Sequence, residues 1–260
     1  MAPVPNIMPL ALAASLCALA IAPVAAQTEP RARVLDEITY QECLALVRRA
    51  PEDGFAQAQV WAATGGGVAA DHCGALALIE LGHYADAADR LEKLLPDAER
   101  QVPHLTVAIL DQAANAWLLA DQPLRARQLM DIAVKAAPDQ PDILIDRAIV
   151  LATLGEFGPA RADLDRALSI DPTREEAYAL RASARRQMKD MAGALEDAET
   201  ALAINHRLPE ALLERGILRL NAGDKRGARA DLIQVRLIAP DGPAAIAAGR
   251  YIEEMDVRAD

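Results

Sequence analysis

The sequence contains few aromatic residues, and this scarcity limits both its possible fold and its possible ligands. Only 3% of the 260 residues are aromatic, and Asp and Glu outnumber Lys and Arg by 38 to 27, which gives a net charge of −11. Nucleic-acid binding needs basic residues for the phosphates and aromatic rings for the bases, so this composition argues against it. Ala and Leu are abundant whereas strand-forming residues are sparse, which favours packed helices over a β-sandwich or barrel.

The sequence also lacks the short motifs that carry common catalytic chemistry. Beyond residue 26 it contains only Ser169 and Ser183 as serines, and it has no G-x-S-x-G, H-E-x-x-H or Walker G-K-[ST] motif. Residues 65–70 match the loose pattern G-x-G-x-x-A, but they follow a helix-like stretch instead of a strand, so a connector between helices is the better interpretation. We therefore expect no enzymatic activity, no cofactor and no metal site. The four histidines are scattered: His72, His83, His104 and His206.

Charged residues are absent from the first 26 positions, which indicates a targeting segment. Residues 10–20 form an apolar run that is too short for an ordinary membrane-spanning helix. Small residues precede Gln27, as signal peptidase requires, so we expect cleavage after Ala26 and export, to the bacterial periplasm. No basic residue stands near the start, which leaves a retained membrane anchor as an alternative. A lipoprotein fits less well, because the bulky Leu16 precedes Cys17.

Cysteine is rare, and only Cys43 and Cys73 remain after the expected cleavage. Two thiols in an exported chain are expected to be oxidised. A bond between them would close a loop of roughly 30 residues and contribute on the order of 3 kcal/mol. A metal pair or a redox-active pair is the alternative, but Cys-x-x-Cys spacing is absent and the neighbouring His72 alone cannot complete a zinc site. The sequence therefore favours a structural disulfide.

A period of 34 residues organises most of the chain. Pro138, Pro172 and Pro240 lie on one 34-residue grid. Three further grids of the same period consist almost entirely of small residues, which indicates repeated units whose helices approach closely. These grids contain Ala126, Ala160, Ala194 and Ala228; Ala133, Ala167, Ala201 and Val235; and Ala114, Ala148, Ala182 and Gly216.

Each period contains the pattern of two helices. In residues 141–174, apolar residues at helical spacing continue to position 154, and Gly155 then ends the run. A second helical stretch follows and stops at Asp171 and Pro172. One such pair cannot bury its apolar faces alone, so the units are expected to stack on one another.

These units resemble tetratricopeptide repeats over residues 107–140, 141–174, 175–208 and 209–242. The resemblance implies an all-α, right-handed superhelical solenoid of antiparallel helix pairs. We expect a helical cap at 27–67, a degenerate unit with a connector at 68–106, and a capping helix with a tail at 243–260. Two units depart from the family pattern, because Arg185 and Arg219 occupy a slot that is usually large and apolar, and Lys189 replaces the usual turn glycine.

An oppositely charged pair recurs with the period, at a separation of 16 residues. In the unit that begins at residue 107 both partners are missing together, and Ala113 and Leu129 stand in their places. Joint presence and joint loss indicate a structural ion pair between the two helices of a unit. The alternative is a ladder of arginines for an anionic ligand. The three pairs are Arg147 with Asp163, Arg181 with Asp197, and Arg215 with Asp231.

The resemblance further implies that the first helix of each unit lines a concave face. The slots that line this face carry acidic and apolar residues here, which predicts a groove for a protein or peptide segment with basic and apolar side chains, or else a merely soluble surface. The Lys and Asn set that binds C-terminal carboxylates in some members of the family is absent. The residues expected on the concave face are Asp111, Asn115, Asp142, Ile145, Asp146, Ile149, Glu176, Arg186, Glu210, Leu213, Glu214 and Ile217.

The sequence therefore favours a non-catalytic periplasmic scaffold or adaptor that binds a protein partner in this groove. One alternative is an accessory factor of cell-wall, division or envelope-assembly machinery. Binding of glycans is weakly supported, because Trp61 and Trp117 are the only tryptophans. A hydrolase with an unrecognised site is the other alternative, and the fold alone cannot decide among these functions.

Overall fold

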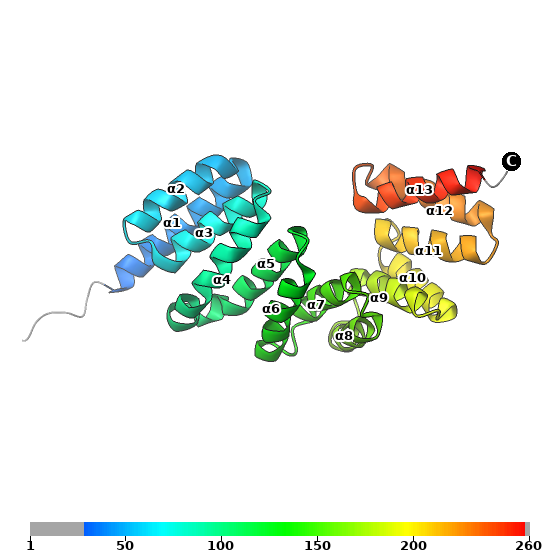
Figure 1. The fold of residues 1–260 in the computed structure, drawn as a ribbon, viewed down its shortest axis with the longest axis horizontal. Coiled ribbons are helices and arrows are strands. Elements are labelled where there is room, and N and C mark those ends of the chain that lie inside the picture. Colours follow the sequence, from blue (N-terminus) through cyan, green and yellow to red (C-terminus); the bar gives the residue numbers. More distant parts are fainter. Residues whose placement is uncertain (1–28, 258–260) are drawn as a thin grey trace, which may run out of the picture.

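A computed structural model describes residues 29–257 of the chain. This part contains thirteen α-helices, one short 3-10 helix and no strand. The helices follow one another along an arc, with α1–α3 at one end and α11–α13 at the other (Figure 1). Their bounds are α1 Glu29–Arg49, α2 Pro51–Ala63, α3 Gly67–Glu80, α4 Tyr84–Gln101, η1 Pro103–Leu105, α5 Thr106–Leu119, α6 Pro123–Ala136, α7 Pro141–Thr153, α8 Phe157–Ile170, α9 Glu175–Gln187, α10 Met191–Ile204, α11 Pro209–Asn221, α12 Lys225–Ile238 and α13 Pro243–Val257.

The fold is the expected all-α solenoid of helix pairs. Extensive contacts join the two helices of each pair, α5 with α6, α7 with α8, α9 with α10 and α11 with α12. The second helix of each pair then contacts the first helix of the next, which continues the array to α13. Stacking of this kind buries apolar faces that a single pair would leave exposed.

Each helix pair turns through a residue with left-handed backbone geometry. Gly155 and Gly223 take φ values of 76° and 85° at this position. The equivalent residues in the other two pairs are Asp121 and Lys189, with φ values of 58° and 70°. Glycine adopts such angles without steric cost, whereas lysine does not, so Lys189 carries local strain.

The alanine grids lie inside the solenoid. Ala114, Ala148 and Ala182 are buried between helices, and Gly216 takes the same place in α11. A Cβ atom added at Gly216 would lie 3.1 Å from Leu232 Cγ, so even a methyl group would crowd this crossing. Small side chains therefore set the close approach of the helices.

The N-terminal helices are held to the array by a disulfide bond and a buried histidine. Cys43 of α1 is bonded to Cys73 of α3, with the Cα atoms 6.3 Å apart. His72 is 3% exposed, and its ring nitrogens interact with Tyr40 Oη and with Gln112 Oε1 of α5. Burial lowers the pKa of His72, so the neutral imidazole accepts from Tyr40 and donates to Gln112.

The expected leader at residues 1–26, with its cleavage after Ala26, lies outside the described residues. Within the described residues, none of the helices is both long enough and apolar enough to cross a bilayer.

Candidate partner-binding groove

Recurrent arginines fix the first helix of three pairs, α7, α9 and α11, against the second helix of the same pair. Arg147 of α7 binds Asp163 of α8 through two parallel hydrogen bonds of 2.7 Å, from Nε and Nη2. The geometry recurs for Arg181 and Asp197, and for Arg215 and Asp231, at 2.7–2.9 Å. A guanidinium fork on a carboxylate is both strong and directional, so these pairs orient α7, α9 and α11.

Two of the arginines also reach back to the preceding helix pair. Arg147 Nη1 donates to Asp131 Oδ1 of α6 at 3.3 Å, and Arg181 Nη1 donates to Asp165 Oδ1 of α8 at 2.8 Å. The pairing predicted within one unit is therefore only half of the network, because the same arginines join neighbouring units. A sequence signal exists for the second acid, since Asp131 and Asp165 each stand 16 residues before their arginine.

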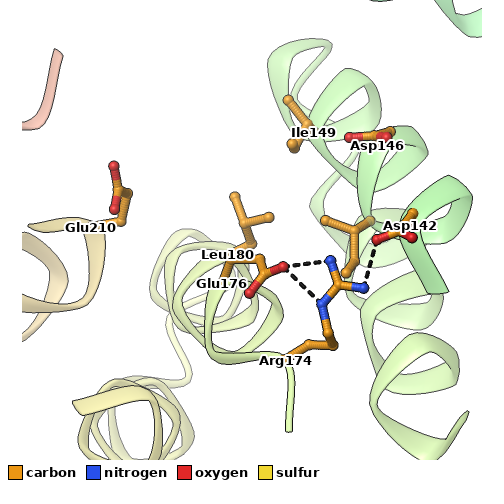
Figure 2. Close-up of a pocket in the computed structure, with 8 residues that line it drawn as sticks. Asp142, Asp146, Ile149, Arg174, Glu176, Leu180 and Glu210 are labelled. Carbon is orange, nitrogen blue, oxygen red and sulfur yellow. Dashed lines mark hydrogen bonds and ion pairs between the residues drawn. The ribbon is translucent and has the colours of Figure 1, made fainter. Parts of the chain in front are cut away.

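The helices so positioned line a cavity of about 300 Å³ between α7, α9 and α11. Figure 2 shows Asp142 and Asp146 on one side of it, Glu210 on the opposite side, and Leu180 between them. The lining combines an aliphatic floor with acidic side chains. Its residues are Asp142, Ile145, Asp146, Ile149, Arg174, Glu176, Leu180 and Glu210.

A second cavity of about 280 Å³ continues from the first toward the C-terminus. The two share Leu180 and Glu210, so we treat them as one groove, which runs from α7 across α9 and α11 to α13. The second cavity is lined by Ala179, Leu180, Ser183, Glu210, Leu213, Glu214, Pro243 and Ala244.

The structure brings most of the concave-face candidates into this groove and leaves four outside its lining. Asp111, Asn115, Arg186 and Ile217 line neither cavity. Those that do are Asp142, Ile145, Asp146, Ile149, Glu176, Glu210, Leu213 and Glu214.

Sequence reasoning missed two central residues of the groove, Leu180 and Arg174. Leu180 lies in the same register as Asp146 and Glu214, 34 residues from each, so the period contained the signal for it. Arg174 precedes α9 in the turn between two repeats, outside the helix positions that the family pattern assigns to the concave face.

Arg174 neutralises two of the acidic residues in the groove. Its Nη1 lies 2.5 Å from Asp142 Oδ1, and its Nε donates to Glu176 Oε1 at 2.8 Å (Figure 2). Glu214 is neutralised as well, because Arg186 donates to both of its carboxylate oxygens, at 2.6 and 3.1 Å. The groove therefore carries fewer free negative charges than its sequence suggests.

Asp111 of α5 and Asp146 of α7 form a carboxyl pair at the α7 end of the groove. Burial and the neighbouring Asp146 carboxylate raise the pKa of Asp111 to about 7, while Asn115 Nδ2 donates to Asp111 Oδ1 at 3.3 Å. Burial also raises the pKa of Asp146. The Asp146 carboxylate disfavours the ionised form of Asp111, so the pair holds one proton below neutral pH.

The acidic residues of the groove do not form a metal site. Within residues 29–257, no three His, Cys, Asp or Glu side chains are placed so that they could hold a metal ion together.

Comparison with known proteins identifies the repeats. Residues 113–185 match the family model of the tetratricopeptide repeat. No curated protein matches the chain.

Solved structures share the fold at low sequence identity. MamA from Desulfovibrio magneticus RS-1 is 16% identical with a TM-score of 0.54, and the match covers 65% of this chain and 93% of that one. YrrB, described as a tetratricopeptide-repeat protein with an unusual peptide-binding site, is 17% identical with a TM-score of 0.50, covering 70% of this chain and 91% of that one. Residues 113–185 thus match the tetratricopeptide repeat, and the helix pairs continue with the same 34-residue period as far as α12.

Proposed function

We propose that this protein is a non-catalytic scaffold that binds a segment of a partner protein in the groove between α7, α9, α11 and α13. The observation that carries this proposal is the continuous groove itself, in which aliphatic side chains form a floor between acidic ones. A peptide can bury apolar side chains on such a floor while its polar groups meet the acidic rim. The repeats supply a rigid wall, because the arginine pairs hold α7, α9 and α11 in fixed orientations.

The fold supports a role in protein interaction. Solenoids of stacked helix pairs present extended concave surfaces, which these proteins use to bind partners. The similar fold of YrrB belongs to a protein described as having a peptide-binding site, which is consistent with peptide binding in this chain.

We also propose that the protein acts outside the cytoplasm, in the bacterial periplasm. The Cys43–Cys73 disulfide supports this location, because the thiols of cytosolic proteins are kept reduced whereas those of exported proteins are oxidised. The uncharged apolar stretch at residues 10–20 supports it as well.

A hydrolytic function has one observation in its favour, the carboxyl pair of Asp111 and Asp146, since two carboxyl groups that share a proton can serve as acid and base. Asp111, however, lines neither cavity, so a substrate held in the groove would meet only Asp146. The geometry therefore favours binding.

Site-specific photocrosslinking in living cells tests the proposal. A photoreactive amino acid at Ile149 or Ser183 would sit in the groove, and the same amino acid at Glu196 of α10 is the control, because Glu196 is exposed and lines neither cavity. We expect a discrete adduct from the groove positions and none from the control. Adducts from position 196 alone would place the interface on another face and overturn the proposal.

A charge-reversal variant gives a second readout of the same crosslink. Asp142→Lys with Glu210→Lys should weaken the groove adduct without loss of helicity, because both side chains are exposed. Glu214 is unsuitable for this purpose, since it is 7% exposed and a lysine there would be buried beside Arg186. An adduct that is unchanged in the double variant would show that the rim charges do not bind the partner.

A further inference from the structure

Ion pairing within the groove leaves free negative charge at two places only. Asp142, Glu176 and Glu214 are each bound by an arginine. Glu210 is exposed and takes part in none of the ion pairs of the described residues. The other free charge belongs to the Asp111–Asp146 carboxyl pair, whose Asp146 lines the first cavity and takes part in none of the ion pairs of the described residues. Asp146 and Glu210 lie on opposite sides of the first cavity (Figure 2).

The surface between these two places is aliphatic. Ile149 of α7 and Leu180 of α9 are half-buried, so each still exposes apolar surface to water inside the cavity. Leu213 extends the same surface into the second cavity. Covering these aliphatic side chains removes apolar surface from water, which favours binding. A partner therefore obtains binding free energy from these aliphatic side chains only if apolar side chains of its own pack against them.

We propose that the groove recognises a segment in which two basic side chains flank aliphatic ones, with one cation for Glu210 and the other for the Asp111–Asp146 pair. This inference rests on the proposed function and names the chemistry of its partner. Charge complementarity argues for the two cations, since an acidic segment would meet two unpaired carboxylate sites. The spacing between the cations is set by the aliphatic floor, because Ile149 and Leu180 lie between the two charges.

The arginines of the groove sharpen this selection. Arg174 and Arg186 are held by their own carboxylates, so neither is free to bind an acidic residue or a terminal carboxylate of the partner. A segment with acidic residues would have to break one of these pairs, which costs the energy of a partly buried ion pair. Rejection of acidic segments is therefore part of the same arrangement.

Selection from a random peptide library displayed on phage tests the inference with the purified chain as target. We expect the enriched sequences to contain two Lys or Arg residues with aliphatic residues between them. Binding of a synthesised enriched peptide should shift the methyl resonances of Ile149, Leu180 and Leu213 in NMR spectra of the protein. Glu210→Gln should weaken this peptide about three- to fivefold, as expected for one partly exposed ion pair, and Glu196→Gln should leave its affinity unchanged.

The outcomes separate this inference from the proposed function. Enriched peptides that are acidic or uncharged but still shift the groove methyl resonances would overturn the partner chemistry and leave groove binding intact. Peptides that bind without any shift of these methyl resonances, or a library without enrichment, would overturn both. A dibasic peptide whose affinity is equal in the Glu210→Gln and Glu196→Gln variants would also overturn the assignment of its cation to Glu210.

Discussion

Arg219 Nη1 donates to Asp231 Oδ2 at 2.7 Å, from the helix position that holds Trp117 three repeats earlier. The equivalent Arg185, one repeat before Arg219, lies 3.1 Å from Asp197 Oδ2. Each of these buried aspartates therefore binds two arginines, one from the recurrent pair and one from the slot that the family fills with a large apolar side chain. The departure from the family pattern extends a charge network inside the solenoid, and the packing is preserved by the long aliphatic stems of arginine.

The ion pair between Arg147 and Asp163 offers a direct test of this network, because the chain contains its apolar replacement. Asp163→Leu alone should lower the free energy of unfolding by about 3 kcal/mol, since it removes the bidentate partner of a partly buried guanidinium. Arg147→Ala with Asp163→Leu reproduces the Ala113 and Leu129 combination of the unit at 107–140. This double variant should recover at least half of the loss in urea denaturation followed by circular dichroism.

A double variant no more stable than Asp163→Leu would contradict this account of the pair. It would mean that the cavity left by the guanidinium, and not the unpaired charge, causes the loss.

The repeat period made the fold predictable, because a helix pair is specified locally. Small residues such as Ala148 and Ala182 recur every 34 positions, and turn residues such as Gly155 separate the helices. Stacking then needs no information beyond the next repeat. The recurrent Arg–Asp spacing was visible for the same reason.

The electrostatics of the groove could not be predicted in this way, since they depend on residues outside the repeat pattern. Arg174 cancels Asp142 and Glu176 from a turn that the family does not assign to ligand binding. The pairing of Asp111 with Asp146 depends on how closely α5 approaches α7, which the sequence does not give. Counting acidic residues along the concave register therefore overestimates the free charge.

The strained turn at Lys189 predicts that a glycine there stabilises the protein. Lys189 has a φ of 70°, where an L-residue with a side chain is disfavoured and glycine is not. Lys189→Gly should raise the free energy of unfolding by about 0.5–1 kcal/mol. Lys93→Gly is the matched control, since Lys93 is exposed within α4 and glycine in a helix interior should cost about 1 kcal/mol. Equal destabilisation by both changes would show that the turn at Lys189 carries no strain.

The disulfide predicts a local effect of reduction at the N-terminal end of the array. Cys43 and Cys73 are 30 positions apart, so their bond should contribute about 3–4 kcal/mol by restricting the unfolded chain. Reduction, or Cys43→Ala with Cys73→Ala, should accelerate amide hydrogen exchange in α2 and α3 and leave exchange in α9–α12 unchanged, because neighbouring repeats unfold with some independence. Uniform acceleration across all helices would contradict this local effect.

The carboxyl pair of Asp111 and Asp146 predicts a dependence of stability on pH that one substitution removes. The pKa of Asp111 is about 7 in the folded protein, above its ordinary value of 3.8, so the folded state binds a proton that the unfolded state has already lost. The contribution of Asp111 to stability is therefore fully present below pH 3.8, falls as the pH rises, and is lost above pH 7.

The Asp111→Asn variant tests this dependence, because asparagine keeps the size of the side chain and can still donate to Asp146 but cannot ionise. As the pH rises from 3.8 to about 7, the free energy of unfolding of this variant should increase by about 1–2 kcal/mol relative to that of the natural chain. This magnitude allows for solvent screening at a partly exposed site. Urea denaturation at a series of pH values measures the difference, with Asp86→Asn on α4 as the control because Asp86 is exposed. A difference that does not change with pH would show that the two carboxyl groups ionise independently.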